Sequence, residues 1–178
     1  VVEARNVSEN SRSIDGVMSV ASDIPLTVAT IAAELKLPGI SIESARLASD
    51  KLAMKEQFKK KGINTPWFSE IYSARDLEEV IHKHAGHVVI KPIDSRGARG
   101  VLRLTAEDDL KWAFSEAQKN SPSKRVMTEE FLDGPQVSTE SIIFNGKMET
   151  PGFSDRNYEF LERFSPYIIE NGGDLPSH

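Results

Sequence analysis

The stretch VVIKPIDSRGARG holds the residue types best suited to chemistry. Three β-favouring residues lead into Lys91, and Pro92 then opens a flexible loop. That loop carries Ser95, Arg96, Gly97, Arg99 and Gly100. A lysine at a strand end supplies a point charge, and glycines let backbone N–H groups approach an anion closely. The pattern is typical of a site that binds a polyphosphate.

The same residues also have structural interpretations. Lys91 alone would fit an edge strand, where lysine discourages pairing between sheets. Gly97 and Gly100 alone would fit a long hairpin turn. The phosphate interpretation therefore depends on what surrounds the loop.

A second lysine stands in an unfavourable place. Lys51 falls in the first turn of a helix expected over residues 51–61, with Asp50 or Ser49 as its cap and Gly62 at its end. The positive end of the helix dipole disfavours a cation there. A bound anion would explain why a lysine occupies this position.

Acidic and polar residues follow on two further expected strands. The strand over residues 125–132 ends in Glu129, Glu130, Phe131 and Leu132. In the next strand, over 136–144, alternation places Gln136, Ser138 and Glu140 on one face. An edge of such acceptors and donors can read a nucleobase. One of the two glutamates equally fits a solvated edge, and Gln136 equally fits a surface position.

Hydrophobic periodicity predicts the elements that position these residues. Strands are expected over residues 14–21, 66–72, 88–91, 101–104, 125–132, 136–144, 147–150 and 167–170. Besides 51–61, helices are expected to follow caps at Ser22 or Asp23, at Ser73 with Asp76, and at Thr105 with Asp108. Asn145-Gly146 predicts a tight hairpin turn.

Composition narrows the function classes. The chain has 178 residues, a net charge of −5 and no cysteine, which argues against non-specific nucleic-acid binding and excludes disulfides and thiolate metal sites. No apolar run could cross a bilayer and no signal peptide is recognisable, so we expect a cytoplasmic location and no membrane partner. Because the sequence opens on Val1 and ends without a closing element, we expect a piece of a longer protein.

Several conspicuous side chains have ordinary interpretations. His82, His84 and His87 suggest a metal cluster, but residues two apart do not share a helix face, so we interpret them as solvated. Core positions are expected for three aromatic residues, Trp67, Trp112 and Phe114.

The ordered set of features resembles the ATP-grasp superfamily of carboxylate–amine ligases. The set comprises the helix that opens with Asp50-Lys51, Lys91 with its glycine loop, the strand 129–132 and the polar strand that includes Glu140. The resemblance covers residues 14–178 and points to the branch that holds the carbamoyl-phosphate synthase large chain, biotin carboxylase and purine-pathway ligases.

The resemblance implies a role for each position. Lys51 and Lys91 match the two phosphate-binding basic residues, and residues 95–100 match the mobile loop that closes over the triphosphate. Residues 129–132 match the hinge strand that meets adenine. Gln136 stands where many relatives have a glutamate that holds the ribose, and Glu140 matches an acidic position that faces the nucleotide cleft.

The resemblance also implies a reaction. ATP phosphorylates a carboxylate to an acyl phosphate, which an amine or a thiol then attacks; the partners are small molecules, and a homodimer stays open. Relatives hold Mg²⁺ through a Glu and a later Glu-x-Asn pair, and no such pair occurs between Phe153 and His178. We therefore expect the metal ligands outside this chain, and the fragment itself to be inactive.

The expected fold is α/β, an incomplete ATP-grasp fold preceded by the end of a Rossmann-like domain. The expected boundaries are 1–46 for the Rossmann-like part, 47–128 for the small ATP-grasp lid and 129–178 for the start of the large subdomain. Two alternatives remain open. One is a non-catalytic ATP-grasp module for nucleotide binding or scaffolding, and the other is an α/β interaction domain without nucleotide.

Overall fold

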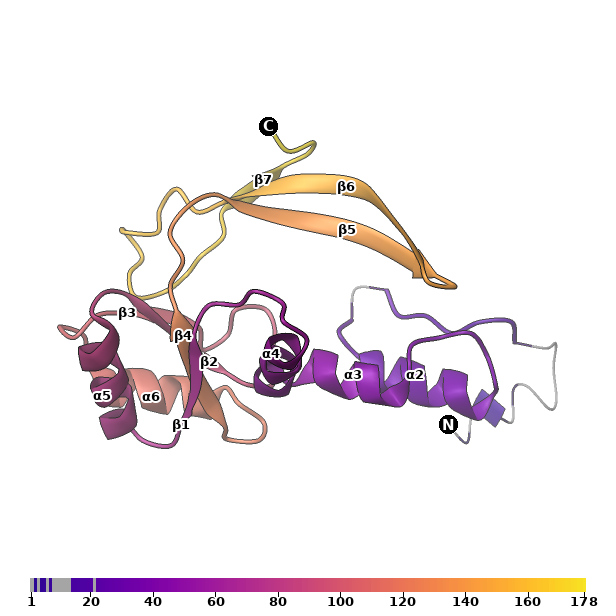
Figure 1. The fold of residues 1–178 in the computed structure, drawn as a ribbon, viewed down its shortest axis with the longest axis horizontal. Coiled ribbons are helices and arrows are strands. Elements are labelled where there is room, and N and C mark those ends of the chain that lie inside the picture. Colours follow the sequence, from indigo (N-terminus) through magenta and orange to yellow (C-terminus); the bar gives the residue numbers. More distant parts are fainter. Residues whose placement is uncertain (1, 3, 6, 8–13, 21) are drawn as a thin grey trace. The chain divides into compact units, whose positions relative to one another are not determined.

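The computed structural model describes residues 2, 4–5, 7, 14–20 and 22–178. It divides into two compact units, residues 1–65 and 66–178, and each is described by itself. Helices and strands carry the labels of Figure 1.

The first unit holds three labelled helices, α2 (Pro25–Glu34), α3 (Ile42–Ser49) and α4 (Lys51–Lys60). The strand expected over residues 14–21 is wrong: residues 14–20 have no regular structure, and residue 21 lies outside the described residues. A strand needs a neighbour to pair its backbone groups, and the described part of this unit contains no strand.

Helix caps in this unit confirm one prediction and correct another. The Asp50 side chain accepts from the Ala53 N–H at 2.9 Å, as expected for the cap of α4. At α2, Ile24 is the cap residue and no side chain caps the helix, so the prediction of Ser22 or Asp23 is wrong. Pro25 opens α2 and has no N–H, which reduces the need for a capping side chain.

The second unit contains a four-stranded antiparallel sheet, which we call sheet A. Its strands are β1 (Phe68–Ile71), β2 (Val88–Pro92), β3 (Leu102–Leu104) and β4 (Val126–Glu130), in the order β1-β4-β2-β3. These four strands and the hairpin between β2 and β3 confirm the predictions.

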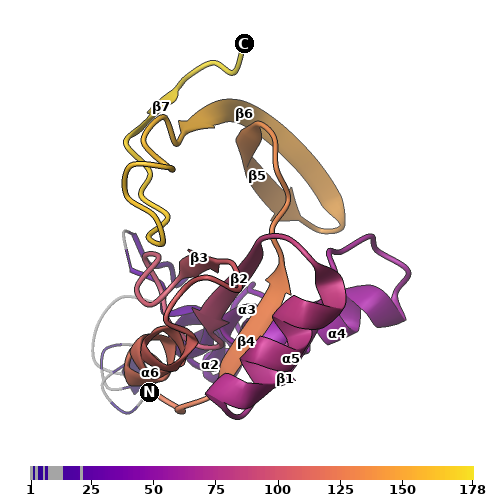
Figure 2. The same ribbon diagram turned by 90° about the vertical axis from the view of Figure 1, so that its left-hand side faces the viewer.

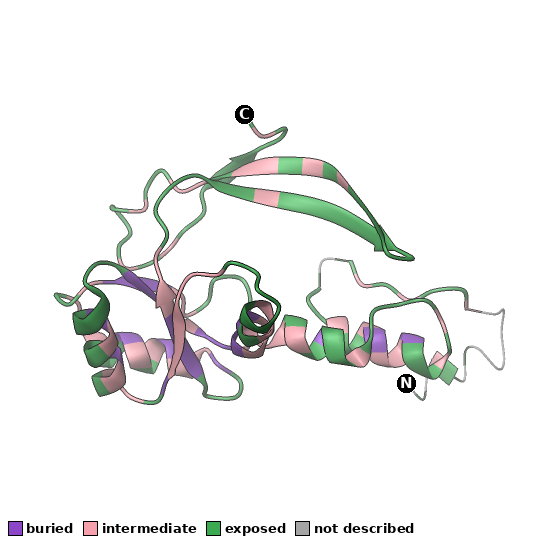
Figure 3. Ribbon diagram, in the orientation of Figure 1, coloured by how far each residue is buried: buried purple, intermediate pink, exposed green. Residues whose placement is uncertain are grey.

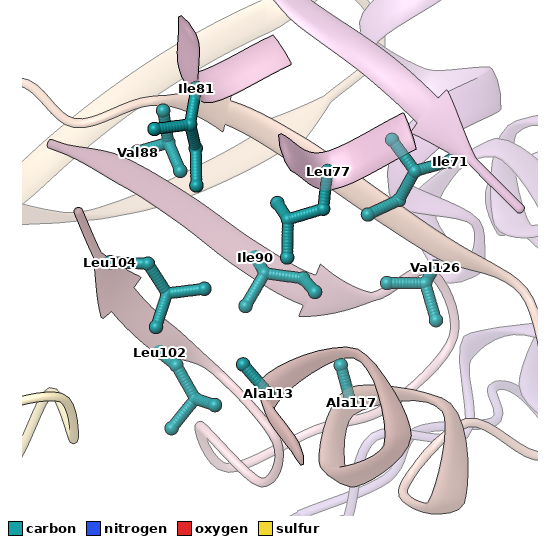
Figure 4. Packing of buried hydrophobic residues seen from close by; sticks show 10 residues of the cluster. All are labelled: Ile71, Leu77, Ile81, Val88, Ile90, Leu102, Leu104, Ala113, Ala117 and Val126. Carbon is teal, nitrogen blue, oxygen red and sulfur yellow. The ribbon is translucent and has the colours of Figure 1, made fainter. Parts of the chain in front are cut away.

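Two helices, α5 (Ala74–His84) and α6 (Leu110–Lys119), pack on one face of sheet A, as Figure 2 shows. Figure 4 shows the resulting core, in which Leu77 and Ile81 of α5 and Ala113 and Ala117 of α6 meet the sheet. The strands contribute Ile71, Val88, Ile90, Leu102, Leu104 and Val126.

The cap predicted for α5 is confirmed, and the start predicted for α6 is not. Ser73 accepts from the Asp76 N–H at 3.2 Å, which confirms the cap of α5. The start predicted for α6 at Thr105 is wrong, because the Asp108 carboxylate is engaged by the Thr105 N–H and hydroxyl in a preceding turn. Asp109 caps the helix instead, accepting from the Trp112 N–H at 3.0 Å.

The second unit also contains a three-stranded antiparallel sheet, which we call sheet B. Its strands are β5 (Gln136–Phe144), β6 (Lys147–Asn157) and β7 (Gly172–Asp174), in the order β5-β6-β7. The turn at Asn145-Gly146 has φ values of 50° and 74°, as the hairpin prediction requires. The strand expected over 167–170 is wrong, because only Tyr167 forms a bridge there, with Leu102.

Among the described residues, no helix has both the length and the apolar character needed to span a membrane.

Candidate functional site

The face of sheet A that points away from α5 and α6 carries a row of neighbouring side chains. Glu129 pairs in register with Phe68 on one side and with Val89 on the other, and Val89 pairs with Arg103. Residues paired in register lie on the same face of a sheet. The row therefore places a carboxylate and a guanidinium on either side of Val89.

Lys91 lies on the same face, one diagonal step from Glu129. Its Nζ donates a hydrogen bond to the Glu129 carboxylate, and the two side chains are only 15% and 12% exposed. β2 lies between β4 and β3, so the edge-strand interpretation of Lys91 is wrong. A largely buried charge pair on an inner strand is costly to maintain without further polar partners, and this pair marks the polar face of the sheet.

The glycine loop connects β2 to β3, and its two glycines have different surroundings. Gly97 (φ 63°) and Gly100 (φ 71°) both adopt the left-handed conformation. A Cβ on Gly100 would lie 2.8 Å from the Asn120 Cβ and 3.0 Å from the Pro92 Cγ, whereas a Cβ on Gly97 would meet nothing within 4 Å. Gly100 is therefore required for packing against the end of α6, and only Gly97 has open space beside it.

The loop arginines line pockets on both sides of the loop. Ser95, Arg96 and Arg99 line a pocket of about 410 Å³ together with Lys119 and Lys124. On its other side, the loop (Gly97 to Val101) lines a pocket of about 620 Å³ whose opposite wall includes Arg156 and Glu170. The second pocket brings the loop opposite Arg156 of β6 and residues 167–170, which connect β6 to β7.

Arg156 is a candidate binding residue that the sequence interpretation missed. It pairs in register with Gln136 across β5 and β6, so it shares the polar face of Gln136 and Glu140. Its guanidinium donates to the Glu170 carboxylate, and this bond lowers the pKa of Glu170 below its ordinary value. Recognising that β6 continues beyond residue 150 would have revealed Arg156 on that face.

The hinge end of β4 lines a third pocket, of about 420 Å³. Its wall includes Glu130 and Phe131, two of the predicted adenine contacts, together with Arg103. Trp67 stacks on His84 at a centroid distance of 3.9 Å at the same pocket. Leu132, the last predicted hinge residue, is 59% exposed.

The histidines were expected to be solvated and three aromatic residues to lie in the core, and both predictions are only partly correct. All three histidines are exposed, but His84 contacts Trp67 and His87 contacts Phe131. Trp67 and Phe114 pack against the core, as predicted. The core prediction for Trp112 is wrong: it is 39% exposed and meets Tyr167 edge to face.

Lys51 lies in the other unit, at the start of α4. Its convergence with Lys91 on one ligand therefore stays a prediction, as do the ligand contacts of the remaining predicted site residues.

Curated relatives share part of this sequence. A D-alanine–D-alanine ligase from Cupriavidus taiwanensis is 26% identical over 114 residues, which is 63% of this chain and 34% of that protein. A carbamoyl-phosphate synthase from Methanobrevibacter smithii is 29% identical over 117 residues, 65% of this chain and 30% of that protein. The chain thus spans about a third of the length of these relatives.

Solved structures show the fold. An L-amino acid ligase from Bacillus licheniformis matches with a TM-score of 0.76 at 23% identity, over 98% of this chain and 39% of that one. A biotin carboxylase from Campylobacter jejuni matches with a TM-score of 0.68 at 20% identity, over 86% of this chain and 36% of that one. These matches confirm the predicted α/β fold, of which the chain holds a part.

The family is shown by the sequence itself. The family model for the ATP-grasp domain matches residues 48–170, which include α4, sheet A, the glycine loop and most of sheet B. The predicted resemblance is confirmed, and D-alanine ligases join carbamoyl-phosphate synthase among the curated relatives. This chain belongs to the ATP-grasp family.

Proposed function

We propose that this chain is the ATP-binding portion of an ATP-dependent ligase that joins a carboxylate to an amine or a thiol through an acyl phosphate. The observation that carries the proposal is the Lys91–Glu129 pair on the inner strands β2 and β4, which links the strand that leads into the glycine loop to the first hinge residue. It offers a cation toward phosphates and a carboxylate toward a base on one face of sheet A.

The base end of the site would form at the hinge. Glu129 can accept a hydrogen bond from the exocyclic amino group of adenine, and Val89 beside it supplies an apolar floor for the ring. Backbone groups of residues 130–132 would complete the polar edge. Gln136 can still donate to or accept from a ribose hydroxyl, because an amide has both kinds of group.

The phosphate end would form at the loop. Lys91 supplies one charge, and Gly97 leaves room for a phosphate to approach the backbone. Arg156, across the pocket from the loop, supplies a planar donor fork suited to phosphate oxygens. Lys51 would add a further charge. Cations fixed in this way stabilise charge that develops during phosphoryl transfer.

The family implies Mg²⁺, which requires converging oxygen ligands. In the described part of the chain, no group of three or more His, Asp or Glu side chains is arranged to hold a metal ion. The residues present do not fit such a site, and no step is assigned to a metal. ATP binding, rather than turnover, is the property we expect of these 178 residues.

The test is calorimetric titration of the chain with ATP, supported by thermal shift at millimolar ATP. We expect saturable binding by the wild type and a loss of about tenfold or more in affinity for Lys91→Met, since a charged contact is removed. Lys147→Met, in the hairpin of sheet B, is the matched control and should bind as the wild type does. Absence of ATP binding by the folded wild type would favour an interaction domain without nucleotide.

The carboxylate substrate, the attacking nucleophile, the homodimer and the cytoplasmic location remain proposals. Binding of ATP by this chain, combined with an absence of ligase activity in the longer protein, would favour the non-catalytic module instead.

A further inference from the structure

Arg103 on β3 is a charged residue that is almost completely buried. Its exposed fraction is 6%, although arginine is rarely buried to this extent unless it is paired. It stands at the end of the row that contains Glu129 and Val89, on the face proposed to receive the nucleotide. Neither the sequence pattern nor the proposed ATP contacts account for it.

Three contacts hold Arg103, and they come from two other segments. Its Nη2 donates to the Glu162 carboxylate at 2.7 Å, and its main-chain N–H donates to the Pro166 carbonyl at 2.8 Å. Its guanidinium carbon lies 5.3 Å from the ring centroid of Phe131, close enough for a cation–π contact. Arg103 thus joins the hinge to residues 158–167, which we call the strap.

The strap leaves β6 and lies along the outer edge of β3. Besides the Arg103 N–H bond, Tyr167 bridges Leu102 and contacts Trp112 edge to face. Sheets A and B are therefore joined twice, covalently through the hinge and non-covalently through the strap. Without the second junction, sheet B could swing about the hinge.

The hydrogen bonding of the Arg103 guanidinium at this junction is incomplete in the described part of the chain. The Nε of Arg103 is buried and has no hydrogen-bond partner among the described residues. A buried donor without a partner is unfavourable, so the guanidinium is held by Glu162 and Phe131 at a cost. Such a contact can be released more readily than a fully bonded one.

We propose that Arg103 is a positioning residue of the nucleotide site. It holds the Phe131 ring in place at the base end and fastens the strap to β3, so that the two sheets stay together while nucleotide is bound. This rests on the proposed ATP site, since Phe131 is one of its predicted contacts. The role is distinct from binding ATP directly.

The experiment compares Arg103→Met with Arg75→Met, an exposed arginine on α5 that pairs with Glu79. For each variant, ATP affinity is measured by calorimetry and nucleotide release by stopped flow with a fluorescent ATP analogue. We expect Arg103→Met to release nucleotide about tenfold faster with little change in association, because the lost contacts act after binding. Arg103→Lys keeps the charge but not the planar stacking, and should be intermediate.

Hydrogen exchange without nucleotide tests the fastening itself. The Arg103 N–H should exchange faster in Glu162→Ala than in the wild type, while the amides of α5 remain unchanged. Glu162 is 82% exposed, so this variant should fold even if Arg103→Met does not. It should also release nucleotide faster, by a smaller factor of about three.

The outcomes separate the two proposals. Absence of ATP binding by the wild type would overturn the ATP site and the positioning role with it. Normal ATP binding and release in Arg103→Met and Glu162→Ala would overturn the positioning role alone. Unchanged exchange at Arg103 in Glu162→Ala would contradict the fastening.

Discussion

Sheets A and B are both antiparallel, yet they differ sharply in burial (Figure 3). All three residues of β3 are buried, and β2 and β4 each contain a run of three buried residues. The longer strands β5 and β6 contain only exposed and half-buried residues. Strand length therefore does not determine burial: α5 and α6 cover one face of sheet A, and on the other face Phe131 and Glu162 contact Arg103.

The candidate site residues likewise fall into two groups, one on each sheet. Lys91, Glu129 and the glycine loop belong to sheet A, which has its own core. Gln136, Glu140 and Arg156 belong to sheet B, whose shape depends on hairpin hydrogen bonds and on the strap. We expect residues of the first group to tolerate few changes, and residues of the second group to affect binding more than folding.

The largest effect should come from removing core volume on one sheet only. Ile90→Ala, in the core of sheet A, should lower the free energy of unfolding by about 3 kcal/mol, because a cavity remains. Ile143→Ala, 69% exposed on sheet B, should change it by less than about 0.5 kcal/mol. Urea unfolding measures both changes in the free energy of unfolding. Equal losses in the two variants would contradict the difference in burial between the two sheets as a source of stability.

Charge removal should separate stability from binding. Lys91→Met should cost about 2 kcal/mol of stability, because Glu129 is left largely buried without this cation. Arg156→Met should cost under about 1 kcal/mol, because that pair is exposed. Both should weaken ATP binding in calorimetry. If Arg156→Met binds ATP like the wild type, Arg156 does not belong to the site.

Replacing glycine with alanine tests whether the glycine loop is packed more tightly than the hairpin turn of sheet B. Gly100→Ala should destabilise by about 2 kcal/mol, since its Cβ would clash with Asn120 in addition to the positive φ. Gly146→Ala has the same strain but open space around it, so about 1 kcal/mol is expected. Thermal unfolding should rank the two variants in this order, and the reverse order would contradict the packing role of Gly100.

The smallest effect concerns acid sensitivity at the start of the glycine loop. Burial alone would raise the pKa of Asp94, but hydrogen bonds from Ser121 and Ser123 lower it overall. A lowered folded-state pKa stabilises the fold above the unfolded pKa of about 4, and this stability is lost as pH falls through the folded value. Asp94→Asn should therefore cost about 1 kcal/mol at pH 7.

The difference between Asp94→Asn and the wild type should narrow as the pH falls below about 4 in unfolding titrations. A constant difference across this range would contradict the ionic contribution.

Local patterns made sheet A and the glycine loop predictable from sequence. Lys91 and the loop are contiguous, and the caps at Asp50 and Ser73 act within three residues. The start of α6 was predicted at Thr105 and lies four residues later, because Asp108 accepts from Thr105 in a separate turn and Asp109 caps the helix.

Other features depend on partners far along the chain. The segment 14–21 has an apolar composition but no strand to pair with in the described residues. Arg103 meets Glu162, 59 residues away, and Arg156 gains its place by pairing with Gln136. Helix α3 was missed although Ser41, which accepts from the Ser44 N–H at 3.0 Å, is a readable cap.

The bond from the Arg103 N–H to Pro166 also has a consequence for solubility. β3 is the last strand of sheet A, and an unprotected outer strand invites a strand from another molecule. Because Pro166 and Tyr167 occupy this edge of β3, they block its pairing with a strand of another molecule. Loosening this segment would thus be expected to promote aggregation even where the core stays intact.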